Sequence, residues 1–179
     1  MRLYIILMVF FLAAYTRSDV PGEYIINEAD GYGYKLMYKA EPWARARDKC
    51  VETGAKLAVP KSEAQFTFIQ KIVRSMKYPN IIGSKYKLLV WLGVYNVVNS
   101  TTWTNIDDEN IEDTGFHTWA GDNGMIIRLM YQSVHVSSNP AEPHCVGIDA
   151  ANFGLRSYWC HLHQPYICEI NIKTHSTNQ

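Results

Sequence analysis

Three of the four cysteines in this 179-residue chain lie in one short stretch, CVGIDAANFGLRSYWCHLHQPYIC, at residues 145–168. Cysteines at short paired spacings such as C-x-x-C bind zinc, and the sequence contains no such pair. The other common chemistry of paired cysteines is oxidation to disulfides. Together with Cys50, the residues Cys145, Cys160 and Cys168 suffice for two disulfides, so we expect a structural role for all four.

The same stretch contains an arginine and a tyrosine, Arg156 and Tyr158, two residues apart. If residues 155–158 form a strand, side chains alternate and these two share one face. A guanidinium beside a phenol offers hydrogen-bond donors and a ring without any metal. We expect such a surface to suit acidic ligands, either carboxylated or phosphorylated glycans or an acidic protein surface. A solvent-exposed arginine without a ligand is the alternative.

Two further groups of residues have side chains of metal-binding type. The run DDENIED, residues 107–113, is the densest acidic segment, but it lacks the glycine and oxygen spacing of a calcium-binding loop. A solvated loop is therefore the favoured interpretation. His161 and His163 are two residues apart, with His144 as a third candidate, whereas a zinc site needs three or four convergent ligands. We expect no metal in either place.

No motif of a known catalytic site is present: we find no nucleophile elbow, no glycine-rich phosphate loop and no H-E-x-x-H. We therefore expect a binding protein and not an enzyme. Asn99-Ser100-Thr101 is a sequon, which in a secreted chain predicts an N-linked glycan on Asn99 in a surface turn.

The charges balance, with 17 basic and 17 acidic residues. Because the sequence contains no basic stripe, we expect neither nucleic acid nor a membrane surface as a partner. Residues 3–15 are uncharged, follow Arg2 and precede small residues at 16 and 18, so residues 1–18 are interpreted as a secretory signal peptide. An N-terminal membrane anchor is the alternative. We expect a secreted protein with its disulfides formed in an oxidising compartment.

The rest of the chain is predicted to form one α+β domain at residues 34–171, between a leader at 19–33 and a polar tail at 172–179. A strand is expected near residues 34–38, and another at 55–59. Between them, a helix should begin at Pro42 and end before Gly54. The residues expected on its buried face are Trp43, Ala46, Cys50 and Val51.

A second helix should begin at Ser62, which forms a capping box with Gln65. Residues 87–95, KLLVWLGVY, are typical of a strand covered on both faces, with Trp91 in the core. Later short strands are expected at 101–104, 145–149, 155–159 and 165–170. The buried stripe of the second helix should be Phe66, Ile69, Val73 and Met76.

These pieces resemble the C-type lectin-like domain when taken in order, and arthropod immune lectins in particular. The resemblance covers about residues 34–170 and runs through WARARDKC (43–50), WLGV (91–94), Trp103, Trp119, CVGI (145–148), YWC (158–160) and YICE (166–169). It implies two helices packed on antiparallel sheets, with a long loop region and the disulfides Cys50–Cys168 and Cys145–Cys160. By chain entropy these bonds contribute roughly 4 to 5 and roughly 3 kcal/mol.

Lectins of this family bind calcium through oxygen donors in the loops, and this sequence departs from their pattern at each place. Trp119 is followed by AGDNG, which supplies Asp122 and Asn123 without the family's proline. Glu142 is one position away from the expected glutamate. The family's Trp-Asn-Asp triplet is replaced by residues 155–157, Leu-Arg-Ser, where the arginine repels a divalent cation. We expect no calcium at the usual sugar site.

The resemblance leaves two functions open. The first is a secreted protein of innate immunity that binds microbial surface glycans through an altered site without calcium, with Asp122, Asn123, Glu142, Arg156 and Tyr158 as candidate ligand-binding residues. The second is a protein-binding module on the same fold. Glycan binding is favoured, and the sugar and the oligomeric state are not predicted.

Overall fold

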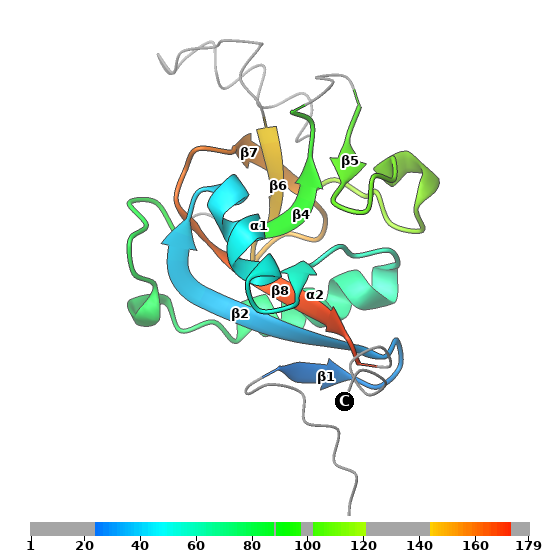
Figure 1. Cartoon of the computed structure of the whole chain (residues 1–179), viewed down its shortest axis with the longest axis horizontal. Coiled ribbons are helices and arrows are strands. Elements are labelled where there is room, and N and C mark those ends of the chain that lie inside the picture. Colours follow the sequence, from blue (N-terminus) through cyan, green and yellow to red (C-terminus); the bar gives the residue numbers. More distant parts are fainter. Residues whose placement is uncertain (1–23, 88, 98–101, 121–143, 173–179) are drawn as a thin grey trace, which may run out of the picture.

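The computed structural model describes residues 24–172, apart from residue 88 and the segments 98–101 and 121–143. These residues form a mixed sheet with a helix packed on each face (Figure 1). The main strand order is β1-β2-β8-β4-β6-β7, with β3 paired to β8 and β5 to β4. The strands are β1 (Ile25–Asn27), β2 (Tyr32–Glu41), β3 (Lys56–Leu57), β4 (Val90–Tyr95), β5 (Thr104–Asn105), β6 (His144–Ile148), β7 (Arg156–Trp159) and β8 (Gln164–Asn171).

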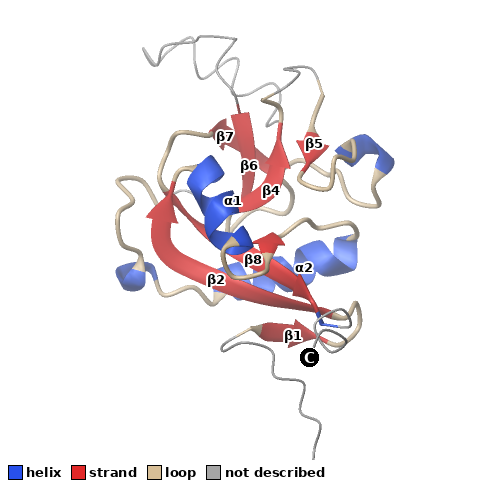
Figure 2. Cartoon of the chain, viewed as in Figure 1, coloured by secondary structure: helices blue, strands red, loops and turns tan. Residues whose placement is uncertain are grey.

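The helices are α1 (Trp43–Val51) and α2 (Glu63–Arg74), with short 3₁₀ turns η1 (Tyr78–Asn80) and η2 (Ile111–Asp113), as Figure 2 shows. Ser62 caps α2 by accepting a hydrogen bond from the Gln65 amide at 3.2 Å. The return bond of Gln65 goes to the amide of Lys61 and not to that of Ser62. No helix in the described part of the chain has both the length and the apolar character needed to cross a bilayer.

Each face of the sheet has its own core, because side chains alternate along the central strands. On β4, Val90, Leu92 and Val94 pack toward α2, whereas Trp91 packs toward α1 and is fully buried. Burial on both faces explains the continuous apolar run that the sequence shows here. Trp43 joins α1 to this strand by donating its indole N–H to the Leu92 carbonyl at 2.7 Å.

The two disulfides are those that the family resemblance implied. Cys50 of α1 is bonded to Cys168 of β8, and Cys145 of β6 is bonded to Cys160. The first joins residues 118 positions apart, and the second joins residues 15 positions apart. The first bond therefore holds the long-range architecture and the second closes a local loop.

Three details differ from the sequence interpretation. The sheet is not purely antiparallel, because β4 pairs with β8 in parallel at Trp91 and Tyr166. Residues 25–27, placed in the leader, form a strand on β2. Val51 is 61% exposed and not on the buried face of α1, since it follows Cys50 by one residue and is rotated by about 100° around the helix. The buried stripe of α2 is confirmed at Phe66, Ile69 and Val73, and Met76 is buried just after the end of the helix.

Candidate functional site

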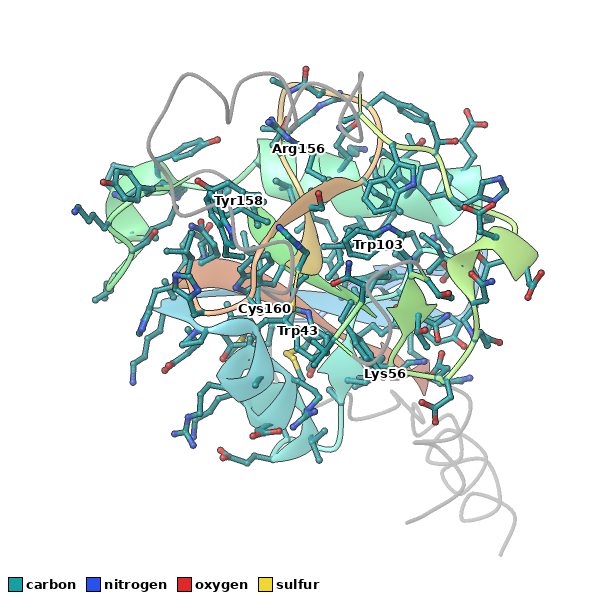
Figure 3. The ribbon with its side chains drawn as sticks, turned by 90° about the horizontal axis from the view of Figure 1, so that it is seen from above. Trp43, Lys56, Trp103, Arg156, Tyr158 and Cys160 are labelled. Carbon is teal, nitrogen blue, oxygen red and sulfur yellow. A yellow bond between two sulfur atoms is a disulfide. The ribbon has the colours of Figure 1, made fainter. Side chains whose placement is uncertain are left out.

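Arg156 and Tyr158 lie on β7, the strand at the outer edge of the sheet, which pairs antiparallel with β6. Arg156 is opposite Gly147, and Tyr158 is opposite Cys145. Because side chains alternate along a strand, Arg156 and Tyr158 share one face. Figure 3 looks down on this end of the molecule and shows both side chains.

A buried carboxylate holds the guanidinium of Arg156. Nη1 of Arg156 is 2.5 Å from Oδ2 of Asp149; the arginine side chain is 41% exposed and the aspartate side chain 10% exposed. Asp149 also accepts hydrogen bonds from the amides of Ala151 and Asn152, each at 2.7 Å, and from the Asn152 side chain. The arginine is therefore fixed at one end and accessible to solvent along part of its length.

The pKa of Asp149 reflects two opposing effects. Burial raises the pKa, but the hydrogen bonds from Arg156, from the Asn152 side chain and from two backbone amides outweigh burial. The pKa therefore lies below the usual aspartate range. The carboxylate stays ionised at neutral pH and keeps its hold on the arginine.

The backbone beside Arg156 is fixed by pairing between Leu155 and the segment that leads into residues 121–143. The Leu155 amide donates to the Thr118 carbonyl at 2.8 Å, and the Ala120 amide donates to the Leu155 carbonyl at 2.9 Å. Gly154 has φ +114°, and a Cβ there would lie 2.5 Å from the Ala120 nitrogen, so glycine is required. Arg156 thus lies next to the base of the loop region.

Tyr158 adds a ring and a neutral hydroxyl to the same face. It packs edge to face on Trp159, with ring centroids 4.9 Å apart, and lies against the core cluster of Trp91. Burial raises the pKa of Tyr158 and Tyr86 adds to this effect, whereas the charge of Arg156 lowers it; the net shift is upward. The phenol therefore stays protonated and can both donate and accept a hydrogen bond.

Trp103 and Trp119 form a pair with ring centroids 4.9 Å apart and an interplanar angle of 53°. Both are partly buried and pack against the core on the α2 side of the sheet. This placement gives the pair a role in packing and gives no reason to treat it as a sugar-stacking platform.

The residues described at the family's calcium position do not fit a calcium ion. Leu155 is 1% exposed and apolar, Arg156 is cationic, and Asp149, the acid that faces Arg156, is already bound by its guanidinium. Calcium requires six to eight oxygen donors, and a paired carboxylate beside a positive charge is a poor donor. The other candidates Asp122, Asn123 and Glu142, like the sequon residue Asn99, lie outside the described residues.

Two acids of the run 107–113, Asp107 and Glu109, form ion pairs with lysines. Asp107 contacts Lys56 at 2.6 Å and Lys61 at 2.9 Å, and Glu109 contacts Lys61 at 2.6 Å. Burial raises the pKa of Asp107, but hydrogen bonds from the two lysines outweigh it and lower the pKa. These acids pair with lysines before the second helix, so their role is structural. No group of three or more potential metal ligands occurs in the part of the chain described, His161 and His163 included.

The comparisons with known proteins agree with this geometry. Residues 39–170 match the family described as the lectin C-type domain, which is most of the chain. The chain belongs to the C-type lectin domain family. A comparison with curated proteins found no match.

Among solved structures, the lectin domain is similar to the carbohydrate-recognition domain of the mouse scavenger receptor C-type lectin, at 15% identity and a TM-score of 0.61, covering 84% of this chain and 97% of that one. It is also similar to SPL-2 from Saxidomus purpuratus, titled a Ca²⁺-independent C-type lectin, at 16% identity, a TM-score of 0.59, and coverages of 84% and 93%. A calcium-independent type II antifreeze protein is similar at 18% identity, a TM-score of 0.57, and coverages of 84% and 93%. At these identities the likeness shows the fold alone.

Sequence reasoning missed Asp149 as a site residue of this lectin domain. The signal was present, because Asp149 follows a strand and precedes Ala-Ala-Asn, a pattern in which an aspartate side chain accepts bonds from the amides that follow it. Its partner Arg156 is seven residues away across a turn, and that pairing depends on the turn's path.

Proposed function

We propose that this C-type lectin-like protein is a secreted binding protein, not an enzyme, that recognises glycans carrying acidic groups without calcium. The proposal rests on one observation: Arg156, at the family's calcium position, is fixed by Asp149 and remains 41% exposed. A fixed guanidinium presents hydrogen-bond donors in a fork that matches a carboxylate or phosphate group. Tyr158, on the same face, adds a hydroxyl and a ring that can pack on a sugar.

Microbial envelopes are rich in such acidic sugars, so a role in innate immunity is part of this proposal. Asp122, Asn123 and Glu142 are proposed to contribute contacts, and Asn99 is proposed to carry a glycan. Two similar structures are titled calcium-independent, one a lectin and one an antifreeze protein, which supports a metal-free member of the fold but names no ligand for this one.

The test is a glycan array probed with the secreted protein, with and without EDTA. We expect binding to carboxylated or phosphorylated glycans that survives EDTA, and a loss of about tenfold in affinity for Arg156→Ala, corresponding to one charge-assisted hydrogen bond. The loss should be larger at low salt, where charge attraction is least screened.

Arg47→Ala is the matched control, because Arg47 is 47% exposed and paired with an aspartate, Asp48, but lies on α1. It should leave glycan binding unchanged. Binding abolished by EDTA and indifferent to Arg156→Ala would instead indicate a calcium lectin. Binding to no glycan, together with capture of a defined protein, would indicate the protein-binding alternative.

A further inference from the structure

The loop between α2 and β4 concentrates exposed apolar side chains. Tyr78, Ile82 and Tyr86 are 45%, 68% and 50% exposed. They are three of the eight large hydrophobic residues exposed in the described part of the chain, and they fall within nine positions of sequence. Residues 77–87, called the 77–87 loop below, project from the side of the molecule away from η2 (Figure 1).

This loop is held in place, so the exposure of Ile82 is not the result of loose packing. The Ile82 amide donates to the Tyr38 carbonyl at 3.1 Å, and the Ala40 amide donates to the Ile82 carbonyl at 2.8 Å, which pairs the loop with β2. The preceding residue, Ile81, is 6% exposed and part of the core. Ile81 anchors the loop, and the alternation of side chains turns Ile82 outward.

The loop is also cationic. Lys77, Lys85 and Lys87 are all exposed, and no acidic residue occurs between Glu63 and Asp107 in the sequence. Nζ of Lys87 donates to the Tyr78 carbonyl at 2.9 Å, and Nζ of Lys85 lies 5.1 Å from the centre of the Tyr86 ring. The lysines therefore surround the exposed tyrosines.

The adjacent turn before β8 borders the same surface. The side chain of Gln164 donates to the Tyr86 carbonyl at 2.6 Å, and His161 and His163, both exposed, line a shallow hollow with Lys85 and Tyr86. Although the total charge of the protein is zero, the 77–87 loop is therefore a basic patch that contains no acidic residue of its own.

We propose that the 77–87 loop docks on the surface of a bilayer that contains anionic phospholipids. Lysines next to such a surface are attracted by its negative potential, and tyrosines favour the interface between water and hydrocarbon. The aliphatic Ile82, the most exposed of the three, gains only by leaving water, which favours a lipid surface over a soluble polysaccharide. The proposal departs from the expectation drawn from composition and does not use Arg156.

The experiment is co-sedimentation of the full secreted protein with vesicles of phosphatidylcholine, alone or mixed with phosphatidylglycerol. We expect binding to the mixed vesicles that weakens with salt. Ile82→Ser should lower the partition coefficient about tenfold, because the buried side chain is lost. Lys85→Gln should lower it about fivefold, as expected for one lysine near an anionic surface.

Val51→Ser is the matched control, since Val51 is 61% exposed but lies on α1. It should leave vesicle binding unchanged. Ile82→Ser in turn should leave glycan binding unchanged, so that failure of this proposal is separate from failure of the glycan proposal. Thermal melts check that each variant is folded. No binding to the mixed vesicles, or retention on an immobilised sulfated polysaccharide without vesicle binding, would overturn the proposal. Equal effects of Ile82→Ser and Val51→Ser would do the same.

Discussion

Two regions of this lectin domain each contain one disulfide and one buried carboxylate, and they use them differently. Around β8, Cys168 is bonded to Cys50, 118 residues away, and the next residue is the buried Glu169. Around β6 and β7, Cys145 is bonded to Cys160, 15 residues away, and the buried acid is Asp149. The first disulfide joins distant parts of the chain, whereas the disulfide and the carboxylate–arginine pair of the second region each form within one segment.

The two acids show what this difference means for charge. Glu169 has a 3% exposed side chain, with Lys56 at 3.3 Å and one amide donor, that of Val59, at 3.2 Å. Burial is the largest effect and raises the pKa of Glu169 to about 7, although Lys56 and Val59 oppose it. Asp149 receives more hydrogen bonds, and its pKa falls instead. The state of a carboxylate therefore depends on the balance between the depth of its burial and the hydrogen-bond donors around it.

The largest effect that tests the comparison is loss of the long-range disulfide. Cys50→Ser should lower the free energy of unfolding by about 5 kcal/mol and Cys145→Ser by about 3 kcal/mol, because the first bond closes the longer loop. Denaturant titrations of both variants measure this difference. Cys168→Ser and Cys160→Ser should reproduce the values of their partners. An equal or reversed order would show that native-state contacts around each bond outweigh chain entropy.

The next effect concerns the residue that joins the two regions. Trp91 is fully buried in the cluster that contains Cys145 and Cys168, and it lies opposite Gly147 of β6 and Tyr166 of β8. Trp91→Ala should lower the free energy of unfolding by about 3 to 5 kcal/mol and reduce the yield of folded protein. Trp91→Phe, which keeps most of the volume, should cost less. A normal yield with unchanged melting of the alanine variant would contradict the core assignment.

The smallest expected effect is on the pH dependence of the free energy of unfolding, to which the two acids contribute with opposite signs. Glu169 has a folded pKa of about 7 against an ordinary value of 4.5, so ionising it opposes folding. The free energy of unfolding should fall by about 3 kcal/mol as pH rises through this window. Asp149 has the opposite sign, because its folded pKa is lowered, and its contribution is lost only as pH falls below its ordinary value of 3.8.

Denaturant titrations of the wild type and two variants across pH measure both contributions. Glu169→Gln should remove the loss between pH 4.5 and 7, since the amide oxygen can still accept from Val59. Asp149→Asn should leave that loss in place and weaken only the acid-side dependence. If the free energy of unfolding of Glu169→Gln falls with pH as steeply as that of the wild type, another group is responsible for the loss.

Much of the fold could be predicted because it depends on neighbours in sequence. The stripe of α2 and its Ser62 cap follow from contacts three and four residues apart. The two-sided burial of β4 follows from an unbroken apolar run. The pairing of the cysteines was predicted from the family resemblance, because local sequence patterns do not show which cysteines pair. Where prediction failed locally, as at Val51, the error was one residue of helical rotation.

The site itself was predicted only in part. The prediction that Arg156 and Tyr158 share one face required only that these residues form a strand, because side chains alternate along a strand. The partner of Arg156 required the turn after β6, which folds back so that Asp149 collects the amides of Ala151 and Asn152 before it meets the guanidinium. The sequence showed a cation at the family's calcium position, and the fold showed that an acid holds it.

By itself, then, the sequence determined the family, the helices, the central strand and the set of disulfide-forming cysteines, because each depends on periodicity or on motif order. The tertiary structure alone decided the charge partners: Lys56 pairs with Asp107, 51 positions away, and this part of the acidic run lies in an ion-pair cluster. It also decided that the 77–87 loop turns Ile82 outward, by pairing with β2. Ion pairs and the exposure of side chains depend on which distant segments the fold brings into contact. No local sequence pattern specifies those contacts.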